Sequence, residues 1–257
     1  MKDKNPHIWQ ILIATVTISV ASIARAEPQP TTEPDEEGPK VVYHNRGVPV
    51  RRVGGGTRGT VDEDLKLIVL TPNEFARTIS PRPTLFWYLS KAVDKPLIVS
   101  IVDTRPQNPR NLLKIEMSGT KPAGIHRLDL SDDQVMNRNQ ADVKAAALES
   151  GIDYRWTVAV VMDPDNRSQD ILASGFVTRV AAPAALEPAK LAADPVGKAA
   201  AFAQNGMWYD ALKALSDAID KKPADQRLRA QRAGLLEQAE LPEVAAAERA
   251  VGKAAAR

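Results

Sequence analysis

The chain contains no cysteine among its 257 residues. Disulfide bonds, thiolate metal sites and cysteine nucleophiles are therefore excluded. Histidine is also scarce, with three residues, and aromatic side chains make up 5% of the chain. Neither a G-x-S-x-G nucleophile elbow nor an H-E-x-x-H metal motif occurs. These absences favour binding over catalysis, although hydrolases that use paired carboxylates have no compact motif to find.

The first residues have the form of a secretory signal. Lys2 and Lys4 precede a mostly apolar run over residues 8–23, and Ala24-Arg25-Ala26 supplies the small residues of a cleavage site. We predict a signal peptide over residues 1–26. The alternative, a retained membrane anchor, is less favoured because the run is short and contains Gln10. An exported protein without cysteine depends on its hydrophobic core, and the form of this signal favours the bacterial periplasm.

The charge balance argues against nucleic acid as a partner. The whole chain has a formal net charge of +2, but cleavage after Ala26 would leave basic and acidic residues equal in number. We expect no stable membrane span after cleavage. Residues 27–45 are rich in Pro, Glu and Thr and are predicted to form a disordered leader that includes His44.

Residues 151–180 carry the clearest structural pattern, two strands joined by a polar turn. Large apolar side chains fall on alternate positions of the first strand: Tyr154, Trp156, Val158, Val160 and Met162. This period is typical of a strand with one buried face. Leu148 and Gly151 precede Tyr154 as in a tyrosine corner, where the hydroxyl bonds a backbone group upstream.

Five further runs are predicted as strands bounded by turn residues: 65–70, 84–90, 97–102, 113–117 and 125–130. With the hairpin they make seven strands, which is typical of an immunoglobulin or fibronectin type III β-sandwich. We therefore predict a mainly β domain over residues 46–180. A short helix is expected over residues 142–149. His126 alternates with apolar residues and is expected to be structural.

The loop of the hairpin is acidic. It contains Asp163, Asp165, Arg167, Ser168 and Asp170. Its carboxylates could bind calcium, but Arg167 stands where an EF-hand needs an oxygen ligand, and the loop glycine is missing. We instead predict that Arg167 pairs with Asp163 or Asp170 and stiffens the loop.

A basic, glycine-rich segment precedes the first of these strands. Its candidate anion-binding residues are Arg51, Arg52, Gly54, Gly55, Gly56, Thr57 and Arg58. Consecutive glycines can turn backbone N–H groups toward an anion, and arginines can add bidentate bonds. The Lys-Ser/Thr pair of a P-loop and the strand–loop–helix context of a nucleotide site are both absent. Two interpretations stay open: packing against the sandwich, with the arginines pairing nearby acids, or contact with a ligand or partner.

After an Ala- and Pro-rich linker at residues 181–195, the composition becomes helical. Residues recur at the spacing of a tetratricopeptide repeat, with Trp208, Tyr209, Ala211 and Leu215 on its face. We predict two helical hairpins, at about 196–220 and 225–254, in a module over residues 196–257. The second unit is degenerate, and two units are fewer than a free solenoid needs. The module is therefore expected either to cap the sandwich or to dimerise.

Several of these segments occur in the same order in one family: RRVGGGTRG, LTPNEFARTISPRPTLFWYLS, LESGIDYRWTVAVVMDPDNRSQD, GFVTRV and NGMWYDALKAL. Over about residues 47–241 the chain resembles the bacterial family called domain of unknown function 928. The resemblance implies cysteines in many relatives at the positions of Thr60 and Met162. If these form a disulfide there, it ties the glycine-rich segment to the hairpin, and this chain lacks both members. The family has no assigned activity, so the resemblance implies architecture and not function.

Together these observations predict an exported, non-enzymatic accessory protein of the periplasm or cell envelope. It is expected to bind an unknown protein partner and to use no cofactor. The first alternative is a module that captures an anion, glycan or lipid headgroup through the Arg/Gly segment. The second and less favoured alternative is a hydrolase of cell-wall glycan.

Overall fold

The computed structural model describes residues 41–43, 53–54, 65–73, 75–105, 110–133, 147–186 and 194–255. All of them belong to one compact unit, Gly38–Arg257. The predicted signal peptide lies outside the described residues, as do most of the predicted leader and most of the helix expected over residues 142–149.

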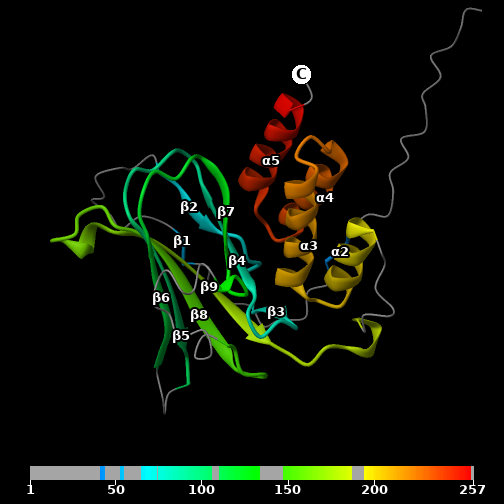
Figure 1. The fold of residues 1–257 in the computed structure, drawn as a ribbon, viewed down its shortest axis with the longest axis horizontal. Helices are drawn as coiled ribbons and strands as arrows, with labels where there is room; N and C mark the ends of the chain where they lie inside the picture. The colour runs from blue at the N-terminus through cyan, green and yellow to red at the C-terminus, as the bar shows by residue number, and fades with distance from the viewer. Residues whose placement is uncertain are drawn as a thin grey trace, which may run out of the picture. The chain divides into compact units, whose positions relative to one another are not determined.

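The described strands form one six-stranded and one three-stranded sheet (Figure 1). They are β1 (Val53–Gly54), β2 (Leu67–Val69), β3 (Ala76–Thr78), β4 (Thr84–Leu89), β5 (Leu97–Asp103), β6 (Arg110–Met117), β7 (Gly124–Asp129), β8 (Asp153–Val160) and β9 (Ile171–Arg179). The larger sheet has the order β1-β9-β8-β5-β6, and the smaller has the order β2-β4-β7. The pairs are antiparallel except for β3, which runs parallel to β9.

All seven predicted strands are present, with ends that differ by a few residues. The two strands that were not predicted, β1 and β3, are too short to show an alternating pattern. Both pair with β9: β1 lies opposite Ser174 and Ala173, and β3 lies beside residues 177–179. The hydrogen-bonding partner, and not the local sequence, makes these two segments into strands.

The inward side chains of the hairpin form the centre of the core. Tyr154, Trp156, Val158 and Val160 of β8 are buried, while Arg155 between them is exposed. By contrast, β4 is buried at every position. A strand buried on both faces must be covered twice, here by the other sheet and by helix α3, which contacts β4.

The sheets are followed by helices, as predicted. These are α2 (Pro195–Gln204), α3 (Trp208–Lys221), α4 (Gln226–Gln238) and α5 (Pro242–Ala255). Asp194 and Asp225 cap α2 and α4, since each carboxylate accepts a hydrogen bond from a first-turn N–H. Among the helices that the structure describes, none is long and apolar enough to cross a membrane.

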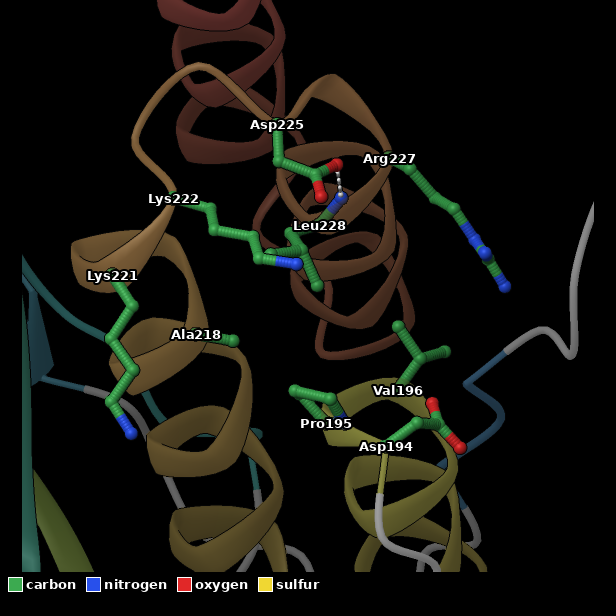
Figure 2. Close-up of a pocket in the computed structure, with 9 residues that line it drawn as sticks. All are labelled: Asp194, Pro195, Val196, Ala218, Lys221, Lys222, Asp225, Arg227 and Leu228. Carbon is green, nitrogen blue, oxygen red and sulfur yellow. Dashed lines mark hydrogen bonds between the residues drawn. The ribbon is translucent and has the colours of Figure 1, made fainter.

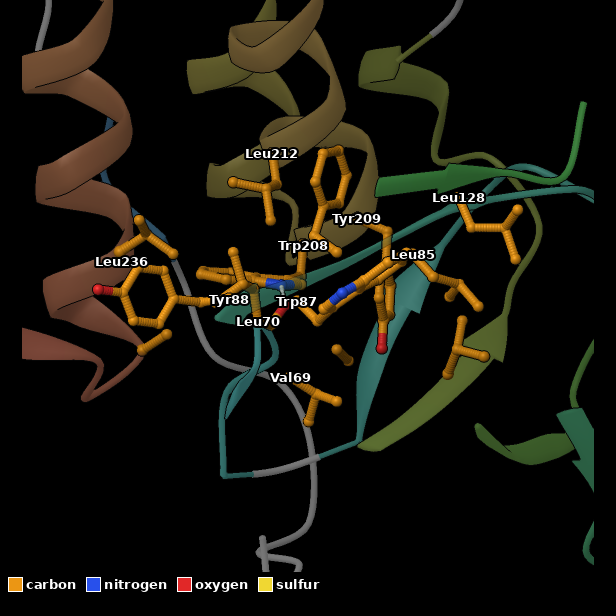
Figure 3. Packing of buried hydrophobic residues seen from close by; sticks show 14 of the residues in the cluster. Val69, Leu70, Leu85, Trp87, Tyr88, Leu128, Trp208, Tyr209, Leu212 and Leu236 are labelled. Carbon is orange, nitrogen blue, oxygen red and sulfur yellow. Dashed lines mark hydrogen bonds between the residues drawn. The ribbon is translucent and has the colours of Figure 1, made fainter. Parts of the chain in front are cut away.

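Sheets and helices contribute to one hydrophobic cluster (Figure 3). The cluster includes Leu186, which lies in a short turn of 3₁₀ helix (Ala184–Leu186) within the predicted linker. Residues 187–193 of that linker lie outside the described residues. The sequence separated a β domain from a helical module, whereas in the structure the two share a core.

Candidate interaction site

The predicted face of the helical repeat packs inward. Trp208, Tyr209, Ala211 and Leu215 are at most 1% exposed. Figure 3 shows Trp208 and Tyr209 reaching from α3 toward residues of the strands, and the Trp208 indole Nε1 donates a hydrogen bond to the Leu70 carbonyl at 2.9 Å. The sequence left two outcomes open for the helical module, capping the sheets or dimerising. These four residues cap the sheets. A partner cannot reach them.

The Tyr209 hydroxyl joins the two sheets' core to α3. It accepts a hydrogen bond from the Trp156 indole Nε1 at 2.9 Å and donates one to the Phe176 carbonyl at 2.7 Å. Thr71 Oγ1 lies 3.4 Å away. Burial raises the pKa of this hydroxyl, which therefore stays protonated as a donor. The carbonyl it satisfies lies on β9 between the residues paired with β1 and those paired with β3.

Glycine is required at position 175, where β9 passes close to Thr71 and Trp156 beside the Tyr209 hydroxyl; we name this contact between α3 and the sheets the junction. A Cβ added to Gly175 would lie 2.6 Å from the Thr71 methyl carbon and 3.1 Å from the Trp156 Nε1. The absence of a side chain at Gly175 therefore lets the segment after β2 approach β9 closely enough for Thr71 to reach Tyr209.

Asp210, in the first turn of α3, bonds the strand beside it. Its carboxylate accepts hydrogen bonds from the Ile79 N–H at 3.1 Å and from the Thr78 hydroxyl. Burial nevertheless raises the pKa of the carboxyl to about 6, because desolvation outweighs these bonds. Asp210 thus links α3 to β3 through hydrogen bonds and has a structural role.

The tyrosine corner predicted at Tyr154 is confirmed. The Tyr154 hydroxyl accepts a hydrogen bond from the Glu149 N–H at 3.0 Å, five residues upstream. Gly151 between them has a positive φ of 80°. His126 is also structural: its ring stacks on Trp87 at 5.8 Å between centroids, and its Nε2 lies 2.8 Å from the Pro122 carbonyl. Burial lowers the pKa of His126 and favours the neutral ring.

In the hairpin loop, Arg167 pairs with Asp170 at 2.5 Å, one of the two predicted partners. Asp163 instead accepts a hydrogen bond from the Asp165 N–H, and the Ser168 hydroxyl bonds Asn166. The carboxylates of the loop are turned to different partners. Within the described residues, no group of three or more His, Cys, Asp or Glu side chains is placed to hold a metal ion.

The candidate anion-binding segment is described only at β1. There Gly54 lies opposite Ala173 at one edge of the larger sheet. Arg51, Arg52, Gly55, Gly56, Thr57 and Arg58 lie outside the described residues, as does Thr60. Met162, the other position implied by the resemblance, is half-buried against the core.

Three buried carboxylates, those of Asp103, Asp170 and Glu248, pair with arginines. Glu248 of α5 bonds Arg232 at 2.7 Å and Arg229 at 3.0 Å, both from α4. Asp103 pairs with Arg105 at 2.5 Å, and Asp170 pairs with Arg167. Burying an unpaired charge is costly, so these pairs hold their elements together. The carboxylates of Asp103, Asp170 and Glu248 are therefore engaged by arginines.

A shallow pocket of about 210 Å³ opens at the ends of the helices (Figure 2). Lys221, Lys222 and Arg227 line it and are exposed, which gives the pocket a basic rim. The N-termini of α2 and α4 also face it, but the carboxylates of Asp194 and Asp225 already accept their N–H groups. An anion would compete with these capping carboxylates for the same donors, so the pocket is a weak candidate for an anion site.

The most informative site is an extended segment bound by α4. Residues 41–43, which we name the strap, are held through their backbone by two glutamines seven positions apart on that helix. The Val41 N–H donates to Gln231 Oε1 at 3.0 Å, and the Gln238 side chain donates to the Val41 carbonyl at 2.9 Å and accepts from the Tyr43 N–H at 2.8 Å. Val41 is 2% exposed, Val42 is 39% exposed, and the Tyr43 ring meets Trp208 edge-on at 5.1 Å.

The free energy gained when the strap binds α4 nearly equals the entropic cost of ordering it. Burying Val41 contributes about 1.5–3 kcal/mol, three hydrogen bonds contribute about 1 kcal/mol each, and the aromatic pair adds about 1 kcal/mol. Fixing three residues costs about 1–2 kcal/mol each, and ordering two glutamine side chains costs about 1 kcal/mol each. Because gain and cost nearly cancel, we expect the strap to leave α4 without unfolding the core.

These three residues lie within the predicted disordered leader, residues 27–45, and in the structure their backbone is hydrogen-bonded to α4. The leader boundary followed charge and proline content, although Val41 and Tyr43 are apolar residues two positions apart immediately after the polar run. That alternation was the available signal. The glutamines gave none, because an exposed glutamine on a helix is ordinary.

Comparison with known proteins gives a family and no activity. The family model described as Domain of Unknown Function (DUF928) matches residues 53–249. No curated protein matches. Among solved structures, a multi-domain immunophilin from Arabidopsis thaliana is 10% identical, with 81% of this chain and 100% of that chain covered and a TM-score of 0.22. Similarity at that level carries no argument about fold or function.

Proposed function

We propose that this protein, which belongs to the Domain of Unknown Function (DUF928) family, is an exported, non-enzymatic accessory protein of the periplasm or cell envelope that binds a protein partner. The strap carries the proposal. Main-chain hydrogen bonds combined with places for alternate side chains are a general way to recognise an extended peptide. The helices of this chain hold residues 41–43 in that way.

Two further observations support binding over catalysis. The buried carboxylates of Asp103, Asp170 and Glu248 are engaged by arginines. Asp210, whose carboxyl has a pKa raised to about 6, bonds β3 and its neighbour and does not line the pocket of Figure 2. A general acid must reach its substrate, and this one is used to attach α3 to the sheets.

We infer that the β part is a sandwich of immunoglobulin or fibronectin type III type. Leaving aside the short β1 and β3, the first, second and fifth strands share one sheet, and the third, fourth, sixth and seventh share the other. This distribution, together with the tyrosine corner on Tyr154, supports that topology.

We also infer that the helices are two tetratricopeptide-like units. Helices α3 and α5 begin at Trp208 and Pro242, which are separated by the length of one such repeat. In each unit, helices that follow one another in sequence pack together. The export signal at residues 1–26 supports the proposed location.

Site-specific photocrosslinking in intact cells tests the proposed function. A photoreactive residue at Ala230, exposed on α4 next to Gln231, is compared with one at Lys114, exposed on β6. We expect one envelope protein to be captured from position 230 and not from 114. Capture from neither position, with the protein correctly exported, would contradict a binding role for the helices. A thermal-shift screen with sulfate, phosphate and anionic glycans would then test the Arg51, Arg52 and Arg58 alternative.

Truncation before the helices is a poor test. Removing the chain after Ala181 would also remove Trp208 and Tyr209 from the core, leaving the Trp156 N–H without its partner. Loss of a partner in such a variant would report unfolding as readily as a lost binding surface.

A further inference from the structure

The strap covers a surface of α4 around Gln231 and Gln238, which we name the groove. The two glutamines that hold the strap make their hydrogen bonds with it through backbone atoms of residues 41 and 43. Backbone bonds of this kind do not depend on the side chains of the bound segment. Selectivity must therefore come from the two inward side chains, a buried valine and an aromatic ring against Trp208.

The residues of α4 that contact the strap lie on one face of the helix. Gln231, Gly234 and Gln238 lie at spacings of three and four, so they share one face of the helix. A Cβ added at Gly234 would meet nothing within 4 Å. The Gln238 amide nitrogen bonds both the Gly234 carbonyl and the Val41 carbonyl, which fixes the side chain for contact with the strap. The groove is thus organised by the helix as well as by its occupant.

We propose that α4 binds an extended peptide of a partner protein, with a β-branched aliphatic residue followed two positions later by an aromatic one, and that the strap is an intramolecular competitor for this groove. This rests on the proposed function and adds the chemistry of the partner and a means of regulation. The partner's segment displaces residues 41–43, takes over their three backbone bonds, and places its aromatic ring against Trp208.

Tethering sets how strongly the strap competes. Nine residues separate Tyr43 from Val53 of β1. A short tether gives an effective concentration on the order of millimolar. A free peptide with a dissociation constant near 100 μM would therefore bind the wild-type chain about tenfold more weakly than a chain whose strap cannot occupy the groove.

The test uses the mature full-length chain and a fluorescent peptide with the sequence of residues 38–46. The strap is removed from the groove by V41D combined with Y43A, which introduces a charge at the buried position and deletes the ring. Anisotropy should show the peptide binding this variant at least about tenfold more tightly than the wild type. Adding Q231A and Q238A should abolish the gain. Q226A, an exposed glutamine at the start of the same helix, is the matched control and should leave it unchanged.

Equal affinity for the strap variant and the wild type would overturn the proposal, as would binding that survives Q231A and Q238A. If the strap variant fails to fold, hydrogen exchange of the wild type decides. The Val41 and Tyr43 amides should exchange at least about a hundredfold faster than amides of the β8 core, and exchange at the same rate would contradict an independent strap. A partner crosslinked equally by wild type and by Q231A/Q238A would leave the proposed function intact and overturn this inference alone.

Discussion

Replacing Tyr209 with phenylalanine tests whether its hydroxyl locks the helices onto the sheets. The change leaves the ring and removes one oxygen, so the buried Trp156 N–H and Phe176 carbonyl lose their partner. Leaving a buried polar group unsatisfied costs about 1–3 kcal/mol. Two such groups predict a loss of about 2–5 kcal/mol in the free energy of unfolding, and a fall in Tm of about 5–15 °C for a unit of this size.

The assay is urea denaturation followed by tryptophan fluorescence and by circular dichroism. Y88F is the control, since Tyr88 is 8% exposed and its hydroxyl has no hydrogen-bond partner among the described residues. It should change stability by less than about 0.5 kcal/mol. The reasoning is refuted if Y209F is as stable as Y88F. Transitions that separate by the two probes in Y209F would show helices leaving sheets that remain folded.

Three further predictions concern other positions of the fold. G175A should destabilise the protein by about 1–3 kcal/mol because the new methyl group meets the Thr71 methyl, and T71S in the same chain should restore most of the loss; full additivity in the double-mutant cycle would contradict this. Since the Asp210 carboxyl has a pKa of about 6 in the folded state and about 4 in the unfolded state, its contribution is fully present below about pH 4 and lost as the pH rises to about 6, a fall of up to about 3 kcal/mol. D210N, which can still accept both hydrogen bonds, should remove this part of the pH dependence, and equal pH profiles for the two proteins would count against the shift. G234A should raise the free energy of unfolding by about 0.5–1 kcal/mol, measured by urea denaturation, because alanine favours the helix and its methyl meets open space; a loss of stability would show that the groove needs a glycine there.

Elements with a strong local signal were predictable from the sequence. The alternation around Tyr154 and Trp156 gave β8, and the spacing of Leu148, Gly151 and Tyr154 gave the tyrosine corner. The pairing of Arg167 with Asp170 followed from proximity along the chain. In each case the partners lie within about five residues, so the pattern could be read locally.

Features that depend on distant partners were not predictable in detail. Strand β3 forms because it pairs in parallel with β9, and the sequence of neither segment indicates that they pair. The sequence identified Trp208 and Tyr209 as a helical face but could not decide what the face contacts. The strap was missed for the same reason: its partners on α4 lie 190 or more residues away. A boundary drawn from composition alone takes no account of such a distant contact.

The shared core explains where a binding surface can remain. A helical module of about 60 residues would bury only about 60% of the surface of its unfolded chain, and without cysteine it has no disulfide to compensate. Packing Trp208 and Tyr209 on the sheets gives the helical module a larger core. The helical face that carries these residues is therefore buried and cannot bind a partner. The side of α4 that carries Gln231 and Gln238 is only partly buried and binds the strap. The strap lies on that side, so the packing that stabilises the helices also determines where the proposed groove lies.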